Sequence, residues 1–346
     1  MTRTRIAAIG VSHWHSLHDA AYLRLLAEMG DVELVGLQDA DATVAAERAA
    51  ALGGVPVFTE YRAMLDRTRP DFVVALGEHR DMAATAHFLL DHGYPFMMEK
   101  PMGVSATEVQ AIAEKAAEKR AFVAVPLSQR YQPFVARARQ MLEAGRFGAL
   151  SHAYFRLNRP TSARYPAWHS AWMLDPARAG GGCLRNLGSH LLDLFLVLTG
   201  EDARVVSALL SARVHGQPVE DYASVQLVSA SGVLGTIEVG NTVPYAGGDG
   251  EWKLAGRDAI LIAYDDGAMR VLTAAGEERI GGRPAPLYRD CVRDLLDHWR
   301  RGAPPPIGVH DLLRVVRLID EAYARASAAP LRSARGSAPS PPGSRS

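Results

Sequence analysis

Cysteine is scarce in this sequence, and its scarcity argues against two kinds of architecture. The two cysteines, Cys183 and Cys291, stand far apart and form no C-x-x-C pair. Small disulfide scaffolds and structural zinc sites need several cysteines at short spacing. We therefore expect two reduced thiols, as is usual in the cytoplasm, and no structural metal site.

An excess of charge of one sign and a long apolar run are missing as well. Lys and Arg together number 38, as do Asp and Glu, so the formal net charge is zero. Without a basic run, neither a nucleic acid nor an anionic membrane is a favoured partner. The apolar segment at residues 6–10 is too short for a signal peptide, and no stretch reaches the roughly 18 apolar residues of a membrane span. The sequence predicts a cytoplasmic protein that acts on small molecules.

Apolar residues make up 48% of the 346 residues, which is enough to fill the cores of about two domains. Up to about residue 125, short apolar runs alternate with helical patterns, and such alternation is typical of βαβ units and a parallel, doubly wound α/β sheet. The runs read as strands are 6–9, 33–37, 72–75 and 94–98, and those read as helices are 20–29, 42–52 and 82–92. Ser105 and Glu108 form a capping box that begins a further helix.

Beyond residue 126 the pattern changes to that of an α+β domain. A long helix is expected near 182–199, and polar and apolar residues alternate in strands 222–228 and 234–239, which indicates an antiparallel sheet with one wetter face. A helix at 310–326 closes the fold. We therefore divide the chain into residues 1–125, residues 126–330 and a disordered tail, 331–346, rich in Ser, Pro, Gly and Arg.

A glycine turn follows the first predicted strand, where a dinucleotide fold places its phosphates. The residues expected at the cofactor are Gly10, Val11, Ser12, His13 and Trp14. Only the first glycine of G-x-G-x-x-G is present, because Ser12 and His15 replace the other two.

Asp39 follows the second predicted strand. A carboxylate there binds both ribose hydroxyls and repels a 2′-phosphate, which favours NAD over NADP. The alternative for Asp39 is a turn residue.

Three histidines, His13, His15 and His18, gather just after this turn. A metal site is disfavoured, because His13 and His15 are two residues apart in a turn without an acidic partner. We expect one or two of these rings to line the phosphate cleft instead.

Glu99-Lys100-Pro101 ends the strand predicted at 94–98. The proline excludes Lys100 from helical dihedral angles, so the amine points in a fixed direction and is a catalytic candidate. The alternative is a strand end without chemistry.

The predicted helix after Gly180-Gly181-Gly182 carries two stripes. Leucines form a core face, and Asn186, His190 and Asp193 line an adjacent face, as in the wall of a cleft. A histidine that only stabilises a half-buried helix is the alternative. Just before the glycines, the loop with Trp168 and His169 is read either as a platform for a sugar ring or as a cap on the core.

These motifs, together with Arg130-Tyr131 and Pro133, resemble those of the Gfo/Idh/MocA oxidoreductases over nearly the whole chain except the tail. The resemblance implies a Rossmann domain followed by a domain with a large open, mainly antiparallel sheet that often makes oligomer contacts. It also implies NAD(P)-linked oxidation or reduction of sugars, polyols or related hydroxy compounds, by a homodimer or homotetramer.

The resemblance also assigns roles to residues. Lys100 stabilises the developing alkoxide and His190 takes the hydroxyl proton, with Asn186 beside them. Further cofactor contacts are expected from Leu76, Gly77, Glu99 and Lys100, which lies near the nicotinamide. The residues expected at the substrate are Tyr131, Trp168, His169 and Asp193.

Three departures from the family pattern concern this chemistry: the depleted glycine turn, Leu76-Gly77-Glu78 in place of Thr-Pro-Asn, and Asn186 in place of aspartate. An asparagine cannot raise the pKa of His190 by its charge. Two alternatives therefore stay open: a non-catalytic relative that binds a dinucleotide or sugar, and a redox-neutral glycosidase that uses NAD.

Overall fold

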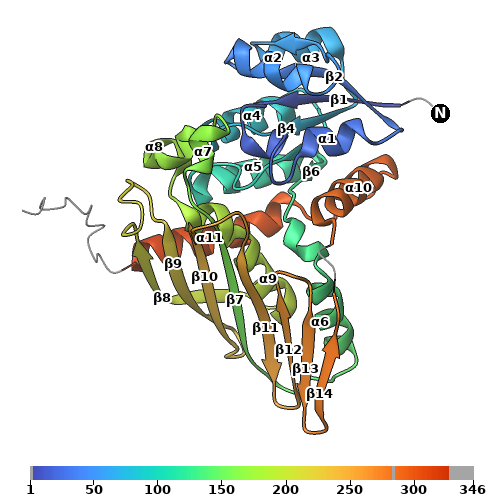
Figure 1. Ribbon diagram of the computed structural model, residues 1–346. Coiled ribbons are helices and arrows are strands. Elements are labelled where there is room, and N and C mark those ends of the chain that lie inside the picture. Colours follow the sequence, from blue (N-terminus) through green and yellow to red (C-terminus); the bar gives the residue numbers. More distant parts are fainter. Residues whose placement is uncertain (1–2, 283–284, 327–346) are drawn as a thin grey trace, which may run out of the picture.

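Two sheets organise the chain (Figure 1). The computed structural model describes residues 3–282 and 285–326. The tail predicted at 331–346 lies outside them. None of the helices in the described residues combines the length and apolar character needed to cross a membrane.

The first sheet confirms the predicted parallel, doubly wound fold. Its six strands have the order β3-β2-β1-β4-β5-β6, and every pairing is parallel. The strands are β1 (Thr4–Ile9), β2 (Val32–Gln38), β3 (Val57–Phe58), β4 (Phe72–Ala75), β5 (Phe96–Met98) and β6 (Val123–Ala124). The helices between them are α1 (Tyr22–Ala27), α2 (Ala42–Ala50), α3 (Tyr61–Thr68), α4 (His79–Asp91) and α5 (Ala106–Lys119).

The segment after β1 differs from the expected strand-to-helix turn. A single 3₁₀ turn, Trp14–Ser16, comes first, and its N-terminal amide is capped by the side chain of His13. Asp19 and Ala21 then adopt positive φ angles of 50° and 46°, which interrupt any helix. As a result α1 begins only at Tyr22, and no helix N-terminus directly follows the glycine turn.

The capping box predicted at α5 is confirmed for Ser105 and wrong for Glu108. The Ser105 hydroxyl accepts a hydrogen bond from the Glu108 amide at 3.3 Å, as predicted. The Glu108 carboxylate, however, accepts from the amide of Val104 rather than from that of Ser105. The serine therefore caps the helix, and the glutamate holds the loop before it.

The second sheet has eight strands in the order β14-β13-β12-β11-β7-β10-β9-β8. The pairing of β7 with β10 is parallel and the others are antiparallel, which confirms a mainly antiparallel sheet. The strands are β7 (Leu150–Pro160), β8 (Ala203–Ser211), β9 (Tyr222–Ser229), β10 (Leu234–Val243), β11 (Asp249–Gly256), β12 (Ala259–Tyr264), β13 (Met269–Thr273) and β14 (Gly276–Ile280).

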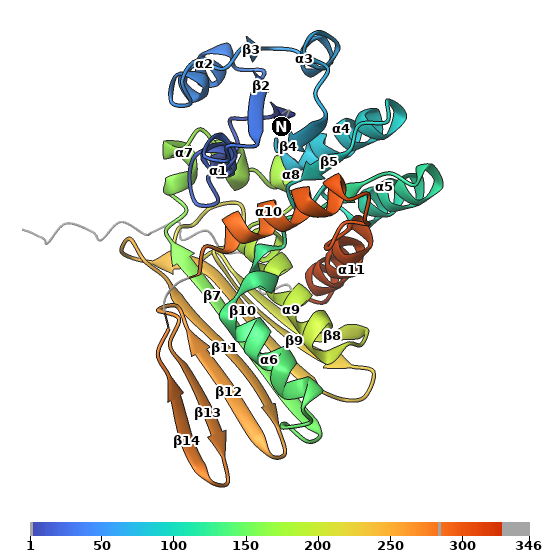
Figure 2. The same cartoon turned by 90° about the vertical axis from the view of Figure 1, so that its right-hand side faces the viewer.

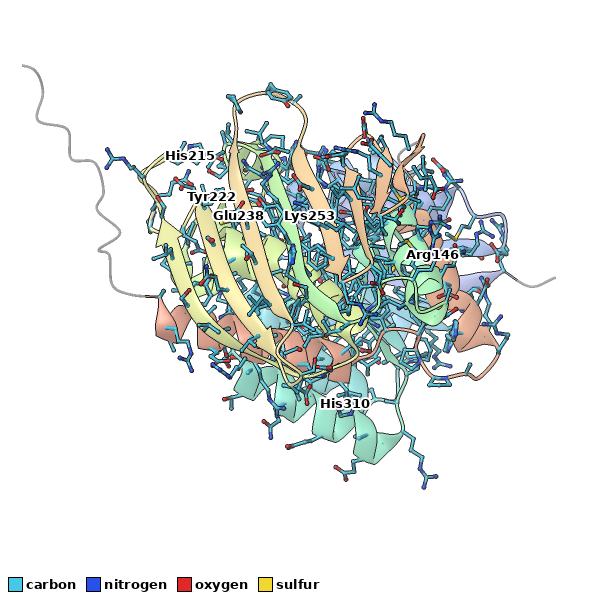
Figure 3. The ribbon with its side chains drawn as sticks, turned by 90° about the horizontal axis from the view of Figure 1, so that it is seen from below. Arg146, His215, Tyr222, Glu238, Lys253 and His310 are labelled. Atoms are coloured by element: carbon cyan, nitrogen blue, oxygen red, sulfur yellow. The ribbon has the colours of Figure 1, made fainter. Side chains whose placement is uncertain are left out.

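Helices cover only one face of this sheet. α6 (Pro133–Glu143), α9 (Ser189–Thr199) and α11 (Val309–Arg325) pack on it around a core that includes Phe155, Leu191 and Leu318 (Figure 2). The other face carries polar side chains such as Tyr222, Glu238 and Lys253 (Figure 3). Assembly into a homodimer or homotetramer through this face stays a prediction, which light scattering would test.

The C-terminal helices return to the first domain. α10 (Leu287–Arg300) contributes Cys291 and Leu295 to a core shared with β1 and α1, and α11 contributes Leu312 to a core shared with α5. Cys183 and Cys291 are both free and buried. The two domains are thus joined by packing as well as by the chain.

The helix expected from 182 to 199 has two parts. A π-helical turn, Leu184–Gly188, leads into α9, which ends at Gly200 with φ of 71°. The wider turn changes which side chains share a face, so the spacing read for a uniform helix does not hold across it.

Gly10 provides a stability test of the glycine turn. Its φ is +69°, and a Cβ at this position would lie 2.6 Å from the Gly77 Cα. Gly10→Ala should therefore lower the free energy of unfolding by roughly 3 kcal/mol or more, because backbone strain and a backbone clash add. The measurement is chemical denaturation followed by circular dichroism.

Gly302→Ala is the matched control for this test. Gly302 has a similar φ of +65° with open space around the Cβ position. It should lose only about 1–2 kcal/mol. Equal losses in the two variants would show that the contact between Gly10 and Gly77 is unimportant.

Candidate active site

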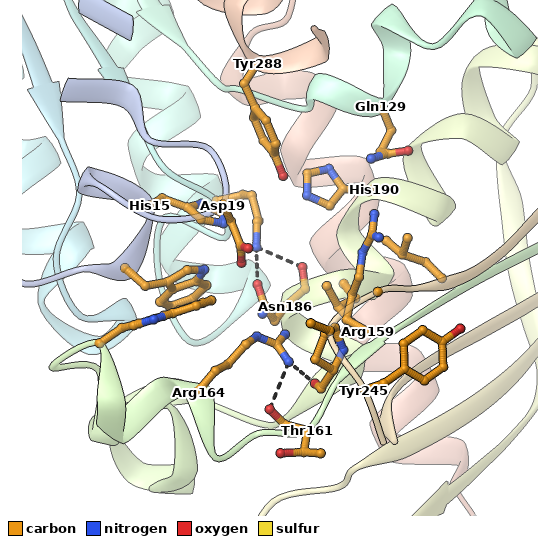
Figure 4. Close-up of a pocket in the computed structure, with 18 of the residues that line it drawn as sticks. His15, Asp19, Gln129, Arg159, Thr161, Arg164, Asn186, His190, Tyr245 and Tyr288 are labelled. Carbon is orange, nitrogen blue, oxygen red and sulfur yellow. Dashed lines mark hydrogen bonds between the residues drawn. The ribbon is translucent and has the colours of Figure 1, made fainter. Parts of the chain in front are cut away.

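A cavity of about 680 Å³ lies where the two domains meet (Figure 4). The first domain contributes Trp14, His15, Asp19 and Lys100 to its lining. The rest of the chain contributes, among others, Gln129, Arg159, Arg164, Trp168, Asn186, His190, Tyr245 and Tyr288.

Lys100 projects into this cavity from the end of β5. It is 1% exposed, and its ammonium donates to the backbone oxygen of Asn186 at 2.9 Å and to the side-chain oxygen of the same residue. Burial lowers the pKa of Lys100, and the negative charge of Glu99 opposes this effect. The amine is thus held in one position and is easier to deprotonate than an exposed lysine.

Glu99 lies behind Lys100, fully buried. One carboxylate oxygen accepts from the Lys100 amide at 3.0 Å, and the other lies 2.8 Å from Nδ1 of His15. Burial favours the neutral acid, but His15 and Lys100 outweigh it and hold the pKa of Glu99 below its usual value. Because the ionised carboxylate only accepts, Nδ1 of His15 is the donor.

Asn186 contacts Lys100 rather than His190. Its side-chain oxygen accepts from the Lys100 ammonium, and its Nδ2 donates to the Tyr165 hydroxyl at 2.9 Å. The asparagine therefore connects the lysine to the second domain.

His190 faces the cavity from α9 as a neutral ring. Its Nδ1 has no hydrogen-bond partner within the described ranges. Burial, helped by the charge of Lys100, lowers the pKa of His190 to about 3. The ring is therefore uncharged near neutral pH, which leaves one ring nitrogen able to accept a hydrogen bond.

Of the four residues predicted at the substrate, Trp168 lines the cavity and three do not. The Tyr131 hydroxyl donates to Asp294 at 2.6 Å. The Asp193 carboxylate receives two hydrogen bonds from Arg130, at 2.7 and 2.6 Å. His169 lies at the surface, 3.4 Å from Glu47.

The residues predicted at the ribose and phosphates lie together at the carboxyl edge of the first sheet. Ser12 donates its amide to the Asp39 carboxylate at 2.6 Å, and Gly10 packs against Gly77. Val11 and Leu76 are buried beside them. The lining of the cavity includes none of these residues.

Residues 162–180, which we call the cover segment, pack on this edge. The segment includes the short helices α7 (Arg164–Ala167) and α8 (Pro176–Ala179). The Ser170 hydroxyl donates to the backbone oxygen of Ser12 at 3.1 Å, and Arg178 makes two hydrogen bonds to Glu78. Between the cover segment and the sheet edge, Trp14, Tyr165 and Trp172 form a buried aromatic cluster.

Two buried histidines under the cover segment have defined tautomers. Nδ1 of His13 accepts from the His15 amide, so its proton is on Nε2, whereas Nδ1 of His79 donates to the backbone oxygen of Ala179. Burial lowers the pKa of both rings, that of His79 to about 3, so both are neutral. Their Nε2 atoms and Nε1 of Trp172 have no hydrogen-bond partner in the described part of the chain.

Several cavity residues were not predicted from the sequence. Tyr288 comes from α10, and Tyr245 and Asp19 come from loops without a motif. Arg159 lies two residues after Leu157 on β7, so the alternation of the strand places both on the cavity side. That alternation was the one available signal.

Comparison with known proteins identifies the family. A model described as the oxidoreductase family with an NAD-binding Rossmann fold matches residues 4–127, and a model of the GFO/IDH/MocA C-terminal domain matches residues 135–269. The chain belongs to the Gfo/Idh/MocA family of NAD(P)-binding oxidoreductases.

Individual members of the Gfo/Idh/MocA family are distant relatives. The rhizopine catabolism protein MocA of Rhizobium meliloti is 26% identical over 73% of this chain and 75% of its own length. The scyllo-inositol 2-dehydrogenase (NADP(+)) IolW of Bacillus subtilis (strain 168) is 23% identical over 66% and 69%. Levoglucosan dehydrogenase in complex with NADH and levoglucosan superposes with a TM-score of 0.82 over 94% of this chain and 97% of its own, at 19% identity, which shows the shared fold.

The residues present fit the NAD(P) cofactor of the Gfo/Idh/MocA family in their chemistry. Unpartnered donors on His13 and Trp172 are buried along the sheet edge, and the bare backbone of Gly10 and Gly77 permits close approach. The cover segment, in contrast, contacts the edge at Ser12 through the hydrogen bond from Ser170. We predict that the cover segment moves when a dinucleotide binds at Ser12 and Asp39.

Arg178→Gln tests this requirement. The ion pair of Arg178 with Glu78 is partly exposed, and such pairs contribute up to about 1 kcal/mol. Without it the open state of the cover segment becomes more populated, so the Kd for NADH, measured by fluorescence titration, should fall by up to roughly fivefold.

Arg257→Gln, which removes the exposed ion pair with Asp258 in the second domain, is the control and should leave the Kd for NADH unchanged. Weaker NADH binding by Arg178→Gln would mean that Arg178 holds the cofactor instead of closing its site.

Proposed function

We propose that this protein is an NAD(P)-dependent dehydrogenase or reductase that acts on a CH–OH group of a sugar, polyol or related hydroxy compound. One observation carries the proposal: the amine of Lys100 and the neutral ring of His190 reach one cavity from two domains (Figure 4). Two relatives, an inositol dehydrogenase and a levoglucosan dehydrogenase, support this substrate class.

The chain's own residues supply the proton chemistry. An ammonium has three N–H groups, and two on Lys100 are committed to Asn186, so the third is free to stabilise an alkoxide in the cavity. His190 is assigned as the acceptor of the hydroxyl proton, because it is a neutral ring that lines the same cavity. The bound nicotinamide supplies the site that accepts or donates the hydride.

Asn186 and Tyr165 act as positioning residues in this scheme. The Tyr165 hydroxyl fixes the amide of Asn186, and this amide fixes the Lys100 ammonium. Both partners are nearly fully buried, so the lysine has little freedom to leave the cavity. Its position is therefore set before any substrate arrives.

NAD is the proposed cofactor in preference to NADP. Asp39 at the end of β2 is the supporting feature, because its carboxylate would repel a 2′-phosphate. Titration with NADH and with NADPH compares the two directly.

Lys100→Met tests the proposed catalytic site. With a panel of polyols and sugars, the formation of reduced nicotinamide followed by absorbance should slow by roughly a hundred- to ten-thousandfold. NADH binding and the circular dichroism spectrum should be retained. Lys115→Met, which removes a surface lysine paired with Asp91, should keep full activity.

Turnover by Lys100→Met close to that of the wild type would overturn the role of Lys100. Binding of NADH or a sugar without turnover by the wild type would instead support a second candidate, a non-catalytic relative. The contact of the cover segment with Ser12 is the observation that favours this candidate. Release of an aglycone without lasting reduction of NAD would indicate the glycosidase.

Asn186→Asp tests the proton path. A carboxylate beside the Lys100 ammonium raises the pKa of Lys100, which burial otherwise lowers, so the lysine stays protonated to higher pH. The alkaline limb of the pH profile of kcat/KM should therefore move upward.

Asn158→Asp, the same exchange at a buried position bonded to Thr242, is the control for this profile. If the profile of Asn186→Asp matches that of the wild type, Asn186 has no part in the proton path.

A further inference from the structure

The charges that line the cavity are unbalanced. Lys100, Arg159 and Arg164 contribute three positive charges, and Asp19 contributes one negative charge, so the lining carries a net charge of about +2. The Glu99 carboxylate is already bound to His15 and to the Lys100 amide behind the cavity. The whole chain, in contrast, is neutral.

Arg159 points into the cavity from the end of β7, with its guanidinium directed toward His190 (Figure 4). Its contact with a carboxylate within the described ranges is a long one, 3.9 Å to Asp265. The charge of Arg159 also lowers the pKa of His190, after burial, Lys100 and His15. Its donors are therefore available to a ligand that also reaches His190.

Arg164 also lines the cavity, from the start of α7. Its guanidinium donates to the backbone oxygens of Pro160 and Thr161, to the Tyr165 hydroxyl and to the Asn241 side chain. All four are neutral acceptors, and the described part of the chain offers Arg164 no carboxylate within 4.0 Å. The arginine is rigidly held, and its charge is not neutralised.

A largely buried positive charge that no carboxylate closely neutralises is unfavourable unless a ligand supplies the negative charge. A guanidinium also matches the geometry of carboxylate and phosphate groups better than an ammonium does. Asp39 and Glu78 lie at the carboxyl edge of the first sheet, whereas Arg159 lies on β7 of the second sheet. A negative group on the substrate, rather than on the cofactor, is the counter-ion that this placement fits.

We propose that the substrate is an anionic hydroxy compound, such as a sugar acid or a sugar phosphate, whose negative group is bound by Arg159 with support from Arg164. The proposal rests on the proposed function, because it takes Lys100 and His190 as the groups that meet the substrate hydroxyl. The cavity volume of about 680 Å³ suits a molecule of monosaccharide size. Trp168, which is partly exposed in this lining, offers an apolar surface for its ring.

Binding is measured by the fluorescence of Trp14 and Trp168 and checked by calorimetry. The probes are glucuronate and galacturonate, glucose 6-phosphate, and neutral glucose and myo-inositol. The acids or the phosphate should bind at least roughly tenfold more tightly than the neutral compounds, because a charge-assisted hydrogen bond is formed. Comparing the two sugar acids with glucose 6-phosphate shows whether the site prefers a carboxylate or a phosphate.

Arg159→Gln should weaken binding of the favoured anion by roughly ten- to a hundredfold and leave binding of neutral sugars unchanged. Arg159→Lys should restore part of the loss. Arg156→Gln is the matched control, because Arg156 lies on the same strand and pairs with Asp249. Unlike Arg159, it is not part of the cavity lining.

Equal affinity for charged and neutral probes, or unchanged anion binding in Arg159→Gln, would overturn the proposal. Loss of NADH affinity in Arg159→Gln would also overturn it, since the arginine would then serve the cofactor. Failure of the proposed function gives a different result from failure of this proposal. In that case the anion would still bind through Arg159, but the wild type would not reduce NAD(P) with any probe.

Discussion

A single buried carboxylate, that of Glu99, is the interaction on which the site depends. It joins the glycine turn to the end of β5 through His15, and it holds the backbone of Lys100 through the amide. Removing one partner of a buried charged group costs about 3–5 kcal/mol, because the other is left uncompensated. The negative charge of Glu99 also opposes the effect of burial on the pKa of Lys100. The same carboxylate therefore influences both the position and the protonation of the lysine.

The fold could be predicted from the sequence because each sheet leaves a periodic pattern. The parallel strands are continuous apolar runs. In the second sheet, polar residues of the outer face, such as Ser224 and Gln226, alternate along the strand with apolar residues of the inner face. The start of α1 was predicted at residue 20, whereas the helix begins at Tyr22. The hydrogen bond that the His13 side chain accepts and the positive φ angles at Asp19 and Ala21 produce no periodic pattern in the sequence. The backbone amide bound by Glu108 was predicted to be that of Ser105 and is that of Val104, one residue earlier.

The candidate site could be predicted only where a motif marks it. Lys100, Asn186 and His190 come from motifs and line one cavity, whereas Tyr131 and Asp193 have the right residue type but are bonded to Asp294 and Arg130. Arg159, Tyr245 and Tyr288 reach the cavity through long-range packing of β7, a loop and α10, which no local pattern encodes. The cover segment likewise became apparent only from its contacts with the first sheet.

The π-helical turn at Leu184–Gly188 provides a contact between the two domains. A π turn holds one more residue than an α turn and leaves a backbone oxygen outside the regular ladder of the helix. The backbone oxygen of Asn186, within this turn, accepts from the Lys100 ammonium at 2.9 Å. The helix thus gives up an internal acceptor to a residue of the other domain. Because this acceptor is a backbone atom, this contact between the domains does not depend on which side chain stands at position 186.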